Sequence, residues 1–251
     1  MSITSILAAM SKGPNFSRTL VVSGPSGVGK STLLDKLFKE FNKDPPRKSP
    51  GDYFRFSVSH TTRRPRTEPP EKAEIPGQHY HFLGSKDDFK SMIDRGEFIE
   101  YAEFSGNFYG TSFETLKSSA NDTRRCILDI EAQGVRKIKA SNKLDPVYLF
   151  ICPPSLAALS SRLDKRGTDK GDALRMRLET AISEIEYAMN PSEKAHDFII
   201  VNDDPDEAYA KFKRVALGYE TAEDDAEIDD RNSATAQGVF KEVEETLKNR
   251  T

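Results

Sequence analysis

The sequence predicts an α/β fold in which helices cover both faces of a parallel sheet. Short apolar segments that are typical of buried parallel strands occur at RTLVVSG (18–24), RCILDIE (125–131), VYLFICP (147–153) and DFIIVND (197–203). Segments with apolar residues at helical spacing separate them, which is the alternation expected of βαβ units. A more polar stretch at about residues 54–111 interrupts this alternation and predicts a small mixed α/β insert.

The other elements follow from residue periodicity and from helix-start and turn signals. Helices are predicted at 31–41, 85–96 and 112–122, and after Ser155, which can cap a helix with Leu156, Leu159 and Leu163 on one face. Strands are predicted at 54–60, at 79–83 and on both sides of a Ser-Gly-Asn turn within 97–111. Proline- and glycine-rich stretches at 42–53 and 66–78 predict loops.

The end of the chain combines an acidic run with a helical pattern. We interpret EDDAEIDD (223–230) as a solvated or disordered linker. Val239, Phe240, Val243 and Leu247 have helical spacing and predict a final helix within 236–250. This helix either docks on the body of the protein or serves as an interaction tail.

Composition excludes several functional classes. The 251 residues carry 37 Lys and Arg against 40 Asp and Glu, whereas nucleic-acid binders usually have a basic excess. No apolar run approaches the roughly 18–20 residues that cross a membrane. The short apolar piece at the N-terminus has no basic residue before it, and no arginine precedes Arg18, so it is a poor match to a targeting signal. Cys126 and Cys152 lie in apolar strands, where buried free thiols are expected. We therefore expect a cytoplasmic protein without nucleic-acid or membrane partners.

The segment GPSGVGKS (24–31) matches the phosphate-binding loop G-x-x-x-x-G-K-[ST], and it lies between a predicted strand and a predicted helix, as the motif requires. Its glycines let backbone N–H groups surround phosphate oxygens, and the helix N-terminus adds positive charge. Lys30 would reach the β- and γ-phosphates of a nucleotide, while Ser31 would bind Mg²⁺. The residues predicted to bind the donor nucleotide are Gly24, Ser26, Gly27, Val28, Gly29, Lys30, Ser31 and Thr32. The loop alone does not distinguish GTPases, ATPases and small-molecule kinases, although no obvious N-K-x-D motif for guanine recognition by a GTPase is present.

A second metal-binding group is predicted at the end of a neighbouring strand. Asp129 ends the apolar run CILDIE, where P-loop proteins carry the carboxylate that contacts Mg²⁺, here through water. Many strands end in aspartate, so the prediction depends on the presence of the phosphate-binding loop.

The stretch VSHTTRRPR (58–66) is a second candidate phosphate site. Arginine binds phosphate in a planar, bidentate geometry, and phosphoryl transfer between nucleotides requires fixed cations around the acceptor phosphate. Arg63 and Arg66 can form such a clamp, with Tyr80 and Tyr109 as phenolic donors. From this stretch alone, a solvated basic loop is an equally good interpretation.

Six segments in order resemble guanylate kinase of the eukaryotic type: GPSGVGKST, FSVSHTTRRPR, E-x-x-G-x-x-Y at 74–80, EFIEYAEFSGNFYGT, ILDIEAQGV and FIxPPS at 150–155. The resemblance covers about residues 18–216. It implies a P-loop core at 18–53, 112–155 and 188–218, a GMP-binding insert at 54–111 and a helical lid at 156–187. Residues 1–17 and 219–251 are then extensions at the two ends of the chain.

The resemblance implies phosphoryl transfer from ATP to GMP or dGMP, with Mg²⁺ as cofactor, by a monomeric enzyme of purine nucleotide metabolism. Arg63, Arg66, Tyr80 and Tyr109 would hold the GMP phosphate, and Glu74 would orient this clamp. The residues at or near guanine would be Ser59, Glu100, Gly110, Thr111, Asp129 and Glu131. Arg64 has no implied role and is expected to be exposed.

The chemistry of guanine agrees with these positions. A carboxylate such as Glu100 can accept from N1–H and N2–H₂ of guanine, while the hydroxyls of Ser59 and Thr111 can donate to O6. Adenine reverses this edge and would leave the carboxylate unpaired, which costs about 1–3 kcal/mol per buried group.

The arginines after residue 155 have two interpretations. Arg162 and Arg166 are four residues apart, and Arg177 follows on the next predicted helix. Composition alone favours a salt-bridged surface. The resemblance instead implies catalytic lid arginines that close over ATP and neutralise the transferred phosphate, with Asn202 near the adenine.

The sequence leaves two alternatives to this function. A guanylate-kinase-like module without catalysis would bind phosphopeptides through the GMP site, but such modules typically lack the lysine and lid arginines that are present here. A P-loop kinase for another acceptor is the second alternative.

Overall fold

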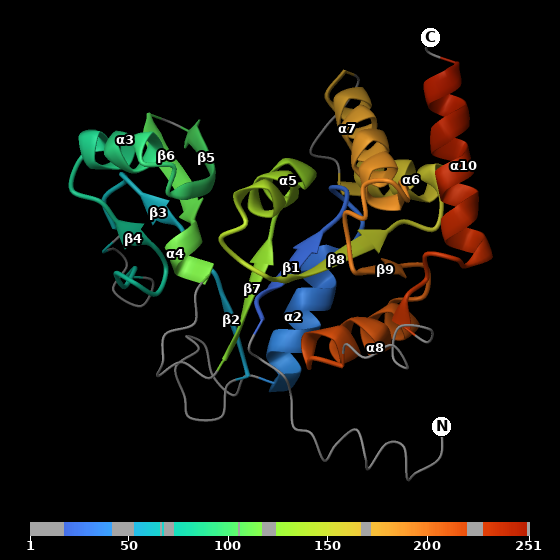
Figure 1. Ribbon diagram of the computed structural model, residues 1–251, viewed down its shortest axis with the longest axis horizontal. Coiled ribbons are helices and arrows are strands. Elements are labelled where there is room, and N and C mark those ends of the chain that lie inside the picture. The colour runs from blue at the N-terminus through green and yellow to red at the C-terminus, as the bar shows by residue number, and fades with distance from the viewer. Residues whose placement is uncertain are drawn as a thin grey trace.

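The computed structural model describes residues 18–41, 53–65, 67, 73–104, 106–116, 124–166, 172–219 and 228–249. A five-stranded parallel sheet forms the core, in the order β2-β7-β1-β8-β9 (Figure 1). Its strands are β1 (Leu20–Ser23), β2 (Phe54–Phe56), β7 (Arg125–Asp129), β8 (Val147–Cys152) and β9 (Phe198–Val201). The predicted α/β class with a parallel-sheet core is therefore confirmed.

Helices cover both faces of this sheet, because alternate residues of the buried strands point in opposite directions. Leu20 and Val22 share an apolar cluster with residues of α2 (Lys30–Phe41) and α8 (Pro205–Ala216). Val21 packs on the other face in a cluster with α5 (Ala132–Ser141). The helices α6 (Leu156–Arg166), α7 (Asp172–Met189) and α10 (Ala234–Lys248) complete the core (Figure 1).

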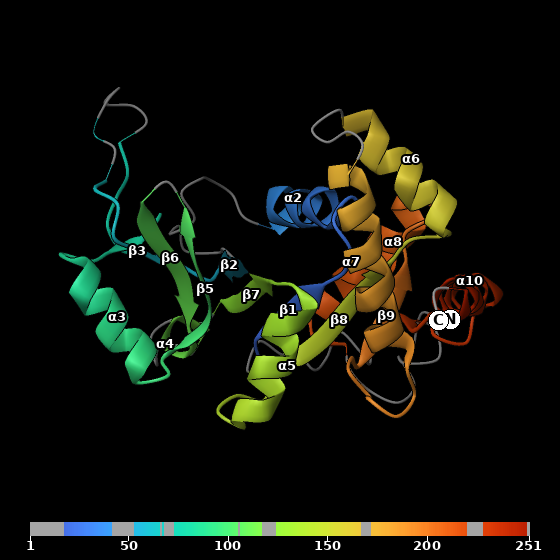
Figure 2. The same ribbon diagram turned by 90° about the horizontal axis from the view of Figure 1, so that it is seen from above.

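A four-stranded sheet in the order β4-β3-β6-β5 forms a separate insert beside the β2 edge of the core (Figure 2). It consists of β3 (His60–Thr61), β4 (His81–Phe82), β5 (Phe98–Phe104) and β6 (Asn107–Ser112), with helices α3 (Lys86–Asp94) and α4 (Phe113–Leu116). Phe89 of α3 stacks on Phe98 and Phe108, with ring centroids 4.3 and 5.1 Å apart. This aromatic stack provides the insert with its own small core.

The predicted strand at 54–60 proved to be two strands in different sheets. β2 pairs in parallel with β7 of the core, whereas β3 pairs with β4 and β6 of the insert. The first three residues of the predicted insert, Phe54–Phe56, are therefore a strand of the core sheet, and the first strand of the insert sheet is β3. Tertiary packing places this strand in the core sheet, because Phe54 is fully buried against the rings of Phe38 and Phe41 on α2.

The predicted helix at 112–122 is described only as α4, since residues 117–123 lie outside the described part of the chain. The final helix is present as α10, and its apolar stripe docks on the body of the protein. The interpretation of 223–230 as a solvated linker is wrong for its last three residues. Ile228 is fully buried, and Asp229 and Asp230 accept hydrogen bonds from the backbone of β9.

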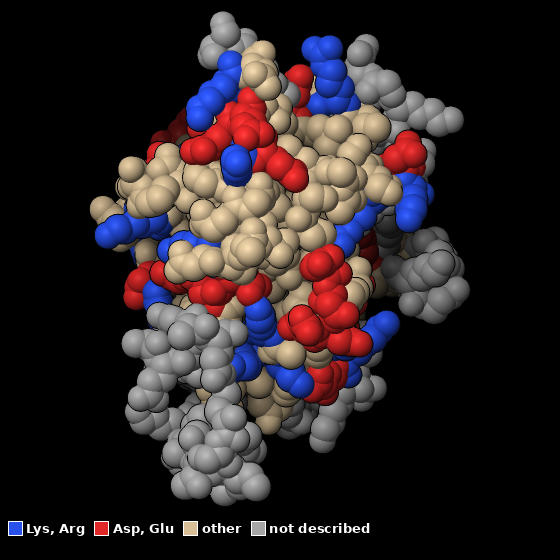
Figure 3. All heavy atoms as spheres, turned by 90° about the vertical axis from the view of Figure 1, so that its right-hand side faces the viewer, with Lys and Arg blue, Asp and Glu red and all other residues tan. Residues whose placement is uncertain are grey.

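Two predictions from composition can be compared with the fold. Cys126 and Cys152 are both free and buried, as expected, and burial raises the pKa of Cys152 to about 12. Among the described residues, no helix has the length and apolar character needed to span a membrane. On the side that carries α10, acidic and basic side chains are interspersed around a broad uncharged area (Figure 3).

Arg125 joins the core sheet to the end of α8 and should be a major contributor to stability. Its side chain is fully buried and donates to the carbonyls of Arg18 (2.9 Å), Val215 (2.6 Å) and Ala216 (3.1 Å). Arg125→Ala leaves these buried acceptors without their donor, so urea denaturation should show a loss of about 3 kcal/mol in unfolding free energy. Arg175→Ala, at a side chain that is 76% exposed, is the control, and equal losses for both variants would contradict this account.

Candidate functional site

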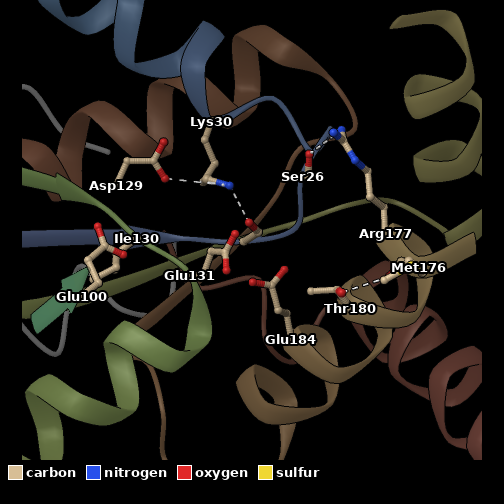
Figure 4. Close-up of a pocket in the computed structure, with 11 residues that line it drawn as sticks. Ser26, Lys30, Glu100, Asp129, Ile130, Glu131, Met176, Arg177, Thr180 and Glu184 are labelled. Atoms are coloured by element: carbon tan, nitrogen blue, oxygen red, sulfur yellow. Dashed lines mark hydrogen bonds and ion pairs between the residues drawn. The ribbon is translucent and has the colours of Figure 1, made fainter. Parts of the chain in front are cut away.

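The phosphate-binding loop connects β1 to α2, and Lys30 begins the helix. The Lys30 ammonium donates to the carbonyl oxygen of Gly24 at 2.5 Å and lies 3.9 Å from the Asp129 carboxylate (Figure 4). Gly29 has a φ of +106°, and a Cβ at this position would lie 2.4 Å from the side-chain nitrogen of Asn202. The loop geometry therefore requires glycine at this position.

Two carboxylates at the end of β7 lie near this lysine. Burial raises the pKa of Asp129, the Lys30 ammonium opposes this shift, and the charge of Glu131 adds to it. The Asp129 side chain is still 40% exposed. It is thus a carboxylate at the wall of an open cavity, able to ionise and to face a ligand.

These groups line a cavity of about 770 Å³, a size typical of small-molecule sites. Its walls include Ser26, Lys30, Asp129, Glu131, Arg177 and Glu184. Figure 4 shows Lys30 and Asp129 on one side of this cavity, with Arg177 pointing from α7 toward Ser26 of the loop. The Arg177 guanidinium lies 3.5 Å from the Ser26 hydroxyl.

The other two arginines of the predicted lid differ in placement. Arg162 donates to the backbone carbonyls of Val28 (3.3 Å) and Asn202 (2.9 Å), so it ties α6 to the phosphate-binding loop and to the end of β9. The side chain of Arg166 lies outside the described part of the structure. Asn202 is buried, and its amide donates to the Val28 carbonyl at 2.7 Å.

A second cavity of about 570 Å³ lies against the insert. Ser59, Tyr109, Gly110 and Thr111 line it, together with Glu100 and Glu131. The last two residues also line the first cavity, so the two cavities meet there.

Three polar side chains of the second cavity form a connected row. The Ser59 and Thr111 hydroxyls lie 3.1 Å apart, and the Thr111 hydroxyl donates to the Glu100 carboxylate at 3.3 Å. Burial raises the pKa of Glu100, the Thr111 hydrogen bond opposes this, and the nearby Glu131 and Asp129 carboxylates raise it further. A Cβ at Gly110 would lie 2.9 Å from the Glu100 carbonyl, so glycine allows the two strands to approach closely beneath the row.

The arginine stretch contributes one ordered cation beside this cavity. The Arg63 guanidinium lies 2.6 and 2.9 Å from the two Glu74 oxygens, and this hydrogen bond raises its pKa. Arg63 also lies over the Tyr80 ring, 5.6 Å from its centroid, and Tyr80 packs against Tyr109. Arg64 is exposed, as predicted, whereas Arg66 lies outside the described residues.

Glu184 is a cavity residue that the sequence analysis missed. It lies on α7, is only 6% exposed and accepts from the backbone N–H of Ala132 at 3.5 Å. Burial raises the pKa of Glu184. Its position could have been suspected from the sequence, because Glu184 is a single carboxylate on the apolar helix face that carries Ala181, Ile185 and Ala188.

The oxygen donors near the phosphate-binding loop are suitable for a magnesium ion that binds together with a nucleotide. Ser31, exposed in the first turn of α2, and Asp129 are both oxygen donors near the loop. No group of three His, Cys, Asp or Glu residues converges to form a metal cage among the described residues. Magnesium commonly keeps several waters and binds one or two carboxylates plus substrate phosphates, so these residues fit it.

The comparisons with known proteins agree with one another. The family model for guanylate kinase matches residues 16–217. Guanylate kinase of Schizosaccharomyces pombe is 43% identical over 200 residues, which are 80% of this chain and 90% of that protein. The human guanylate kinase is 42% identical over 196 residues, covering 78% of this chain and 90% of its own length.

Rice guanylate kinase 1 is 41% identical over 212 residues, which are 84% of this chain but 51% of the rice protein. The chain thus spans about half the length of the plant relatives that it matches. The crystal structure of guanylate kinase from Anaplasma phagocytophilum superimposes with a TM-score of 0.50 at 26% identity, covering 85% of this chain and 91% of that one.

Proposed function

Because the chain belongs to the guanylate kinase family, we propose that it transfers the terminal phosphoryl group of ATP to GMP, giving ADP and GDP. One observation carries this proposal. A cavity at the phosphate-binding lysine and a cavity with the Ser59–Thr111–Glu100 row meet at Glu100 and Glu131. A donor and an acceptor nucleotide can therefore approach each other within one continuous space.

The acceptor site would recognise both ends of GMP. Glu100 would accept from the guanine N1–H and N2–H₂ groups, with Ser59 and Thr111 as hydroxyl partners and Gly110, Asp129 and Glu131 close to the base. Arg63, Arg66, Tyr80 and Tyr109 would hold the phosphate. The Arg63–Glu74 pair supports this assignment, because it fixes the guanidinium before the ligand arrives.

The donor site would bind ATP through the loop from Gly24 to Thr32. Lys30 would exchange its contact with the Gly24 carbonyl for the β- and γ-phosphates, so its charge is already in place. Asn202 is proposed to lie near the adenine. Ser31 and Asp129 would hold Mg²⁺, which supplies charge neutralisation on the transferred phosphate when it is bound.

Catalysis would consist of positioning and charge stabilisation. The GMP phosphate oxygen is already a nucleophile, so the mechanism needs no covalent intermediate and no dedicated base. Arg177 supports the role of the lid, since it already contacts Ser26 of the loop from α7. Arg162 and Arg166 are proposed to join it when the lid closes and excludes water.

In this proposal ATP and GMP are the only partners, and the protein is a cytoplasmic monomer of purine nucleotide metabolism. Light scattering of the purified chain measures the oligomeric state directly. A measured mass of twice that of the monomer would contradict the proposed monomeric state.

Replacing Glu100 tests the proposed acceptor site. Glu100→Gln turns one acceptor oxygen into an N–H₂ donor that faces the guanine donors, so kcat/KM for GMP should fall about 10- to 100-fold. The KM for ATP should stay unchanged in steady-state assays of ADP release. Glu103→Gln, on the same strand and 51% exposed, is the matched control. Unchanged kinetics with GMP in Glu100→Gln would remove Glu100 from the acceptor site.

A further inference from the structure

The edge of the core sheet at β9 is covered by the segment that follows the family domain. The backbone N–H of Ile199 donates to the Asp229 carboxylate at 2.8 Å, and that of Val201 donates to Asp230 at 2.9 Å. The Asp230 N–H in turn donates to the Ile199 carbonyl at 2.7 Å. Side-chain carboxylates thus occupy hydrogen-bonding positions that a further strand would fill, which protects an otherwise open sheet edge.

Both aspartates, Asp229 and Asp230, form ion pairs with basic side chains. Asp230 forms an ion pair with Lys211 of α8, and Arg231 lies 3.5 Å from Asp229 and donates to the His196 carbonyl at 2.8 Å. Anchored in this way, residues 228–231 fix the point from which α10 begins.

α10 then packs against the base of the lid. Its Ala236, Val239 and Val243 are buried in one cluster with the lid-helix residues Ile182, Ile185, Ala188 and Met189. This contact involves only the second half of α7. In the first half, Arg175 is 76% exposed and Met176 is 66% exposed, while Leu174 and Leu178 pack against the other apolar cluster, which contains residues of α2 and α8.

α10 also binds the other lid helix at its first residue. The Glu242 carboxylate accepts from the backbone N–H of Leu156 at 3.0 Å, and Ser155 accepts from Ala158 at 3.0 Å. The N-terminus of α6 is therefore capped once from its own chain segment and once from α10. A carboxylate at this end is also favoured by the helix dipole.

We propose that residues 228–249, called here the C-terminal strap, hold the base of the lid, and that Glu242 is a positioning residue for α6. The strap lies beyond residue 217, where the match to the family model ends. It contacts both helices of the predicted lid at their sheet-proximal ends. The strap thereby sets the orientation from which α6 presents Arg162 to the phosphate-binding loop.

An interaction tail is a poorer explanation of this segment. The apolar side chains Val239 and Val243 are already buried against the protein itself. The described surface on this side is a mixture of both charges rather than a patch of one sign (Figure 3).

The test compares Glu242→Ala with Glu242→Gln and with Glu244→Ala, an exposed glutamate on the same helix. Loss of one helix cap should raise the KM for ATP about three- to ten-fold in Glu242→Ala, without changing the KM for GMP. The amide oxygen of Glu242→Gln still accepts from Leu156, so this variant should keep KM values near those of the unmodified protein. Glu244→Ala should match the unmodified protein.

Hydrogen exchange of the full-length proteins provides a second readout that does not depend on turnover. The amides that begin α6 should exchange faster in Glu242→Ala than in Glu244→Ala. A lower melting temperature with an unchanged ratio of the two KM values would show a purely structural role and overturn the positioning role. Equal exchange of these amides in both variants would show that Glu242 does not cap α6.

This inference rests on the proposed function, but the two can fail separately. If the unmodified protein does not use GMP, the proposed function fails, while hydrogen exchange still reports on the strap. If GMP is used and Glu242→Ala has unchanged KM values, only the inference about the strap is wrong.

Discussion

Lys30→Ala should lower kcat about 10²- to 10³-fold while changing the KM for GMP less than about three-fold. The reason is the position of the ammonium group. It lies between the Gly24 carbonyl and the Asp129 carboxylate in the first cavity, and it does not line the second cavity, where Ser59 and Thr111 lie. Its charge is therefore available to the phosphates of ATP and to the charge that develops during transfer. Steady-state kinetics with each substrate varied in turn measures both constants.

Lys36→Ala is the matched control for this prediction. Lys36 lies on the same helix, its side chain is 46% exposed, and it pairs with Asp206 at the surface. Its removal should leave both kinetic constants unchanged, because exposed ion pairs contribute little. If Lys30→Ala weakened GMP binding as much as it lowered kcat, the division into a donor and an acceptor cavity would be wrong.

Arg63→Ala should raise the KM for GMP roughly 10- to 100-fold, as expected for the loss of charge-assisted hydrogen bonds to a phosphate. Arg63 is fixed on two sides, by the Glu74 carboxylate and by the aromatic rings of Tyr80 and Phe82. Such a guanidinium loses little conformational freedom when a phosphate binds. The KM for ATP should change little.

The neighbouring Arg64 provides an internal control, because it has the same charge and is exposed. Arg64→Ala should leave the KM for GMP within about two-fold of the unmodified value, as expected when only a screened surface charge is lost. Equal increases for Arg63→Ala and Arg64→Ala would indicate a general electrostatic effect of the basic loop. That result would contradict a specific phosphate clamp.

The sequence was sufficient wherever the structural signal is local. The phosphate-binding loop, its flanking strand and its helix are adjacent in the chain, so one motif predicted all three. The strands β1, β7, β8 and β9 were predicted for the same reason, because each lies in a short continuous stretch of mostly apolar, mostly buried residues. The helix after Ser155 and the final helix also follow from spacing within a single segment.

The errors and omissions have a non-local origin. Periodicity predicted strand structure around Phe54, but only pairing with β7 placed this residue in the core sheet. The acidic composition of 223–230 suggested solvation, whereas Asp229 and Asp230 bind backbone groups of an edge strand far away in sequence. Glu184 faces the cavity because α7 packs beside α5. The local pattern shows only a carboxylate on an apolar helix face, not what that face packs against.

The arginines of the predicted lid show that sequence spacing also fails to predict the contacts of candidate functional side chains. The spacing of Arg162 and Arg166 predicts that they share a helix face, but not what each side chain contacts. Arg162 binds the carbonyls of Val28 and Asn202, which belong to two distant segments. Arg177, on a different helix, is the predicted lid arginine that faces the loop hydroxyl of Ser26.

The most direct test of the central claim is a coupled assay of ADP release by the purified chain. It should be supplied with ATP, Mg²⁺ and one of four acceptors: GMP, dGMP, AMP or uridylate. We expect turnover with GMP at a kcat/KM at least about 100-fold above that with AMP, because adenine leaves the Glu100 carboxylate unpaired. Turnover with AMP or uridylate but not GMP would identify a kinase for another acceptor. The absence of turnover with GMP would contradict the proposed function.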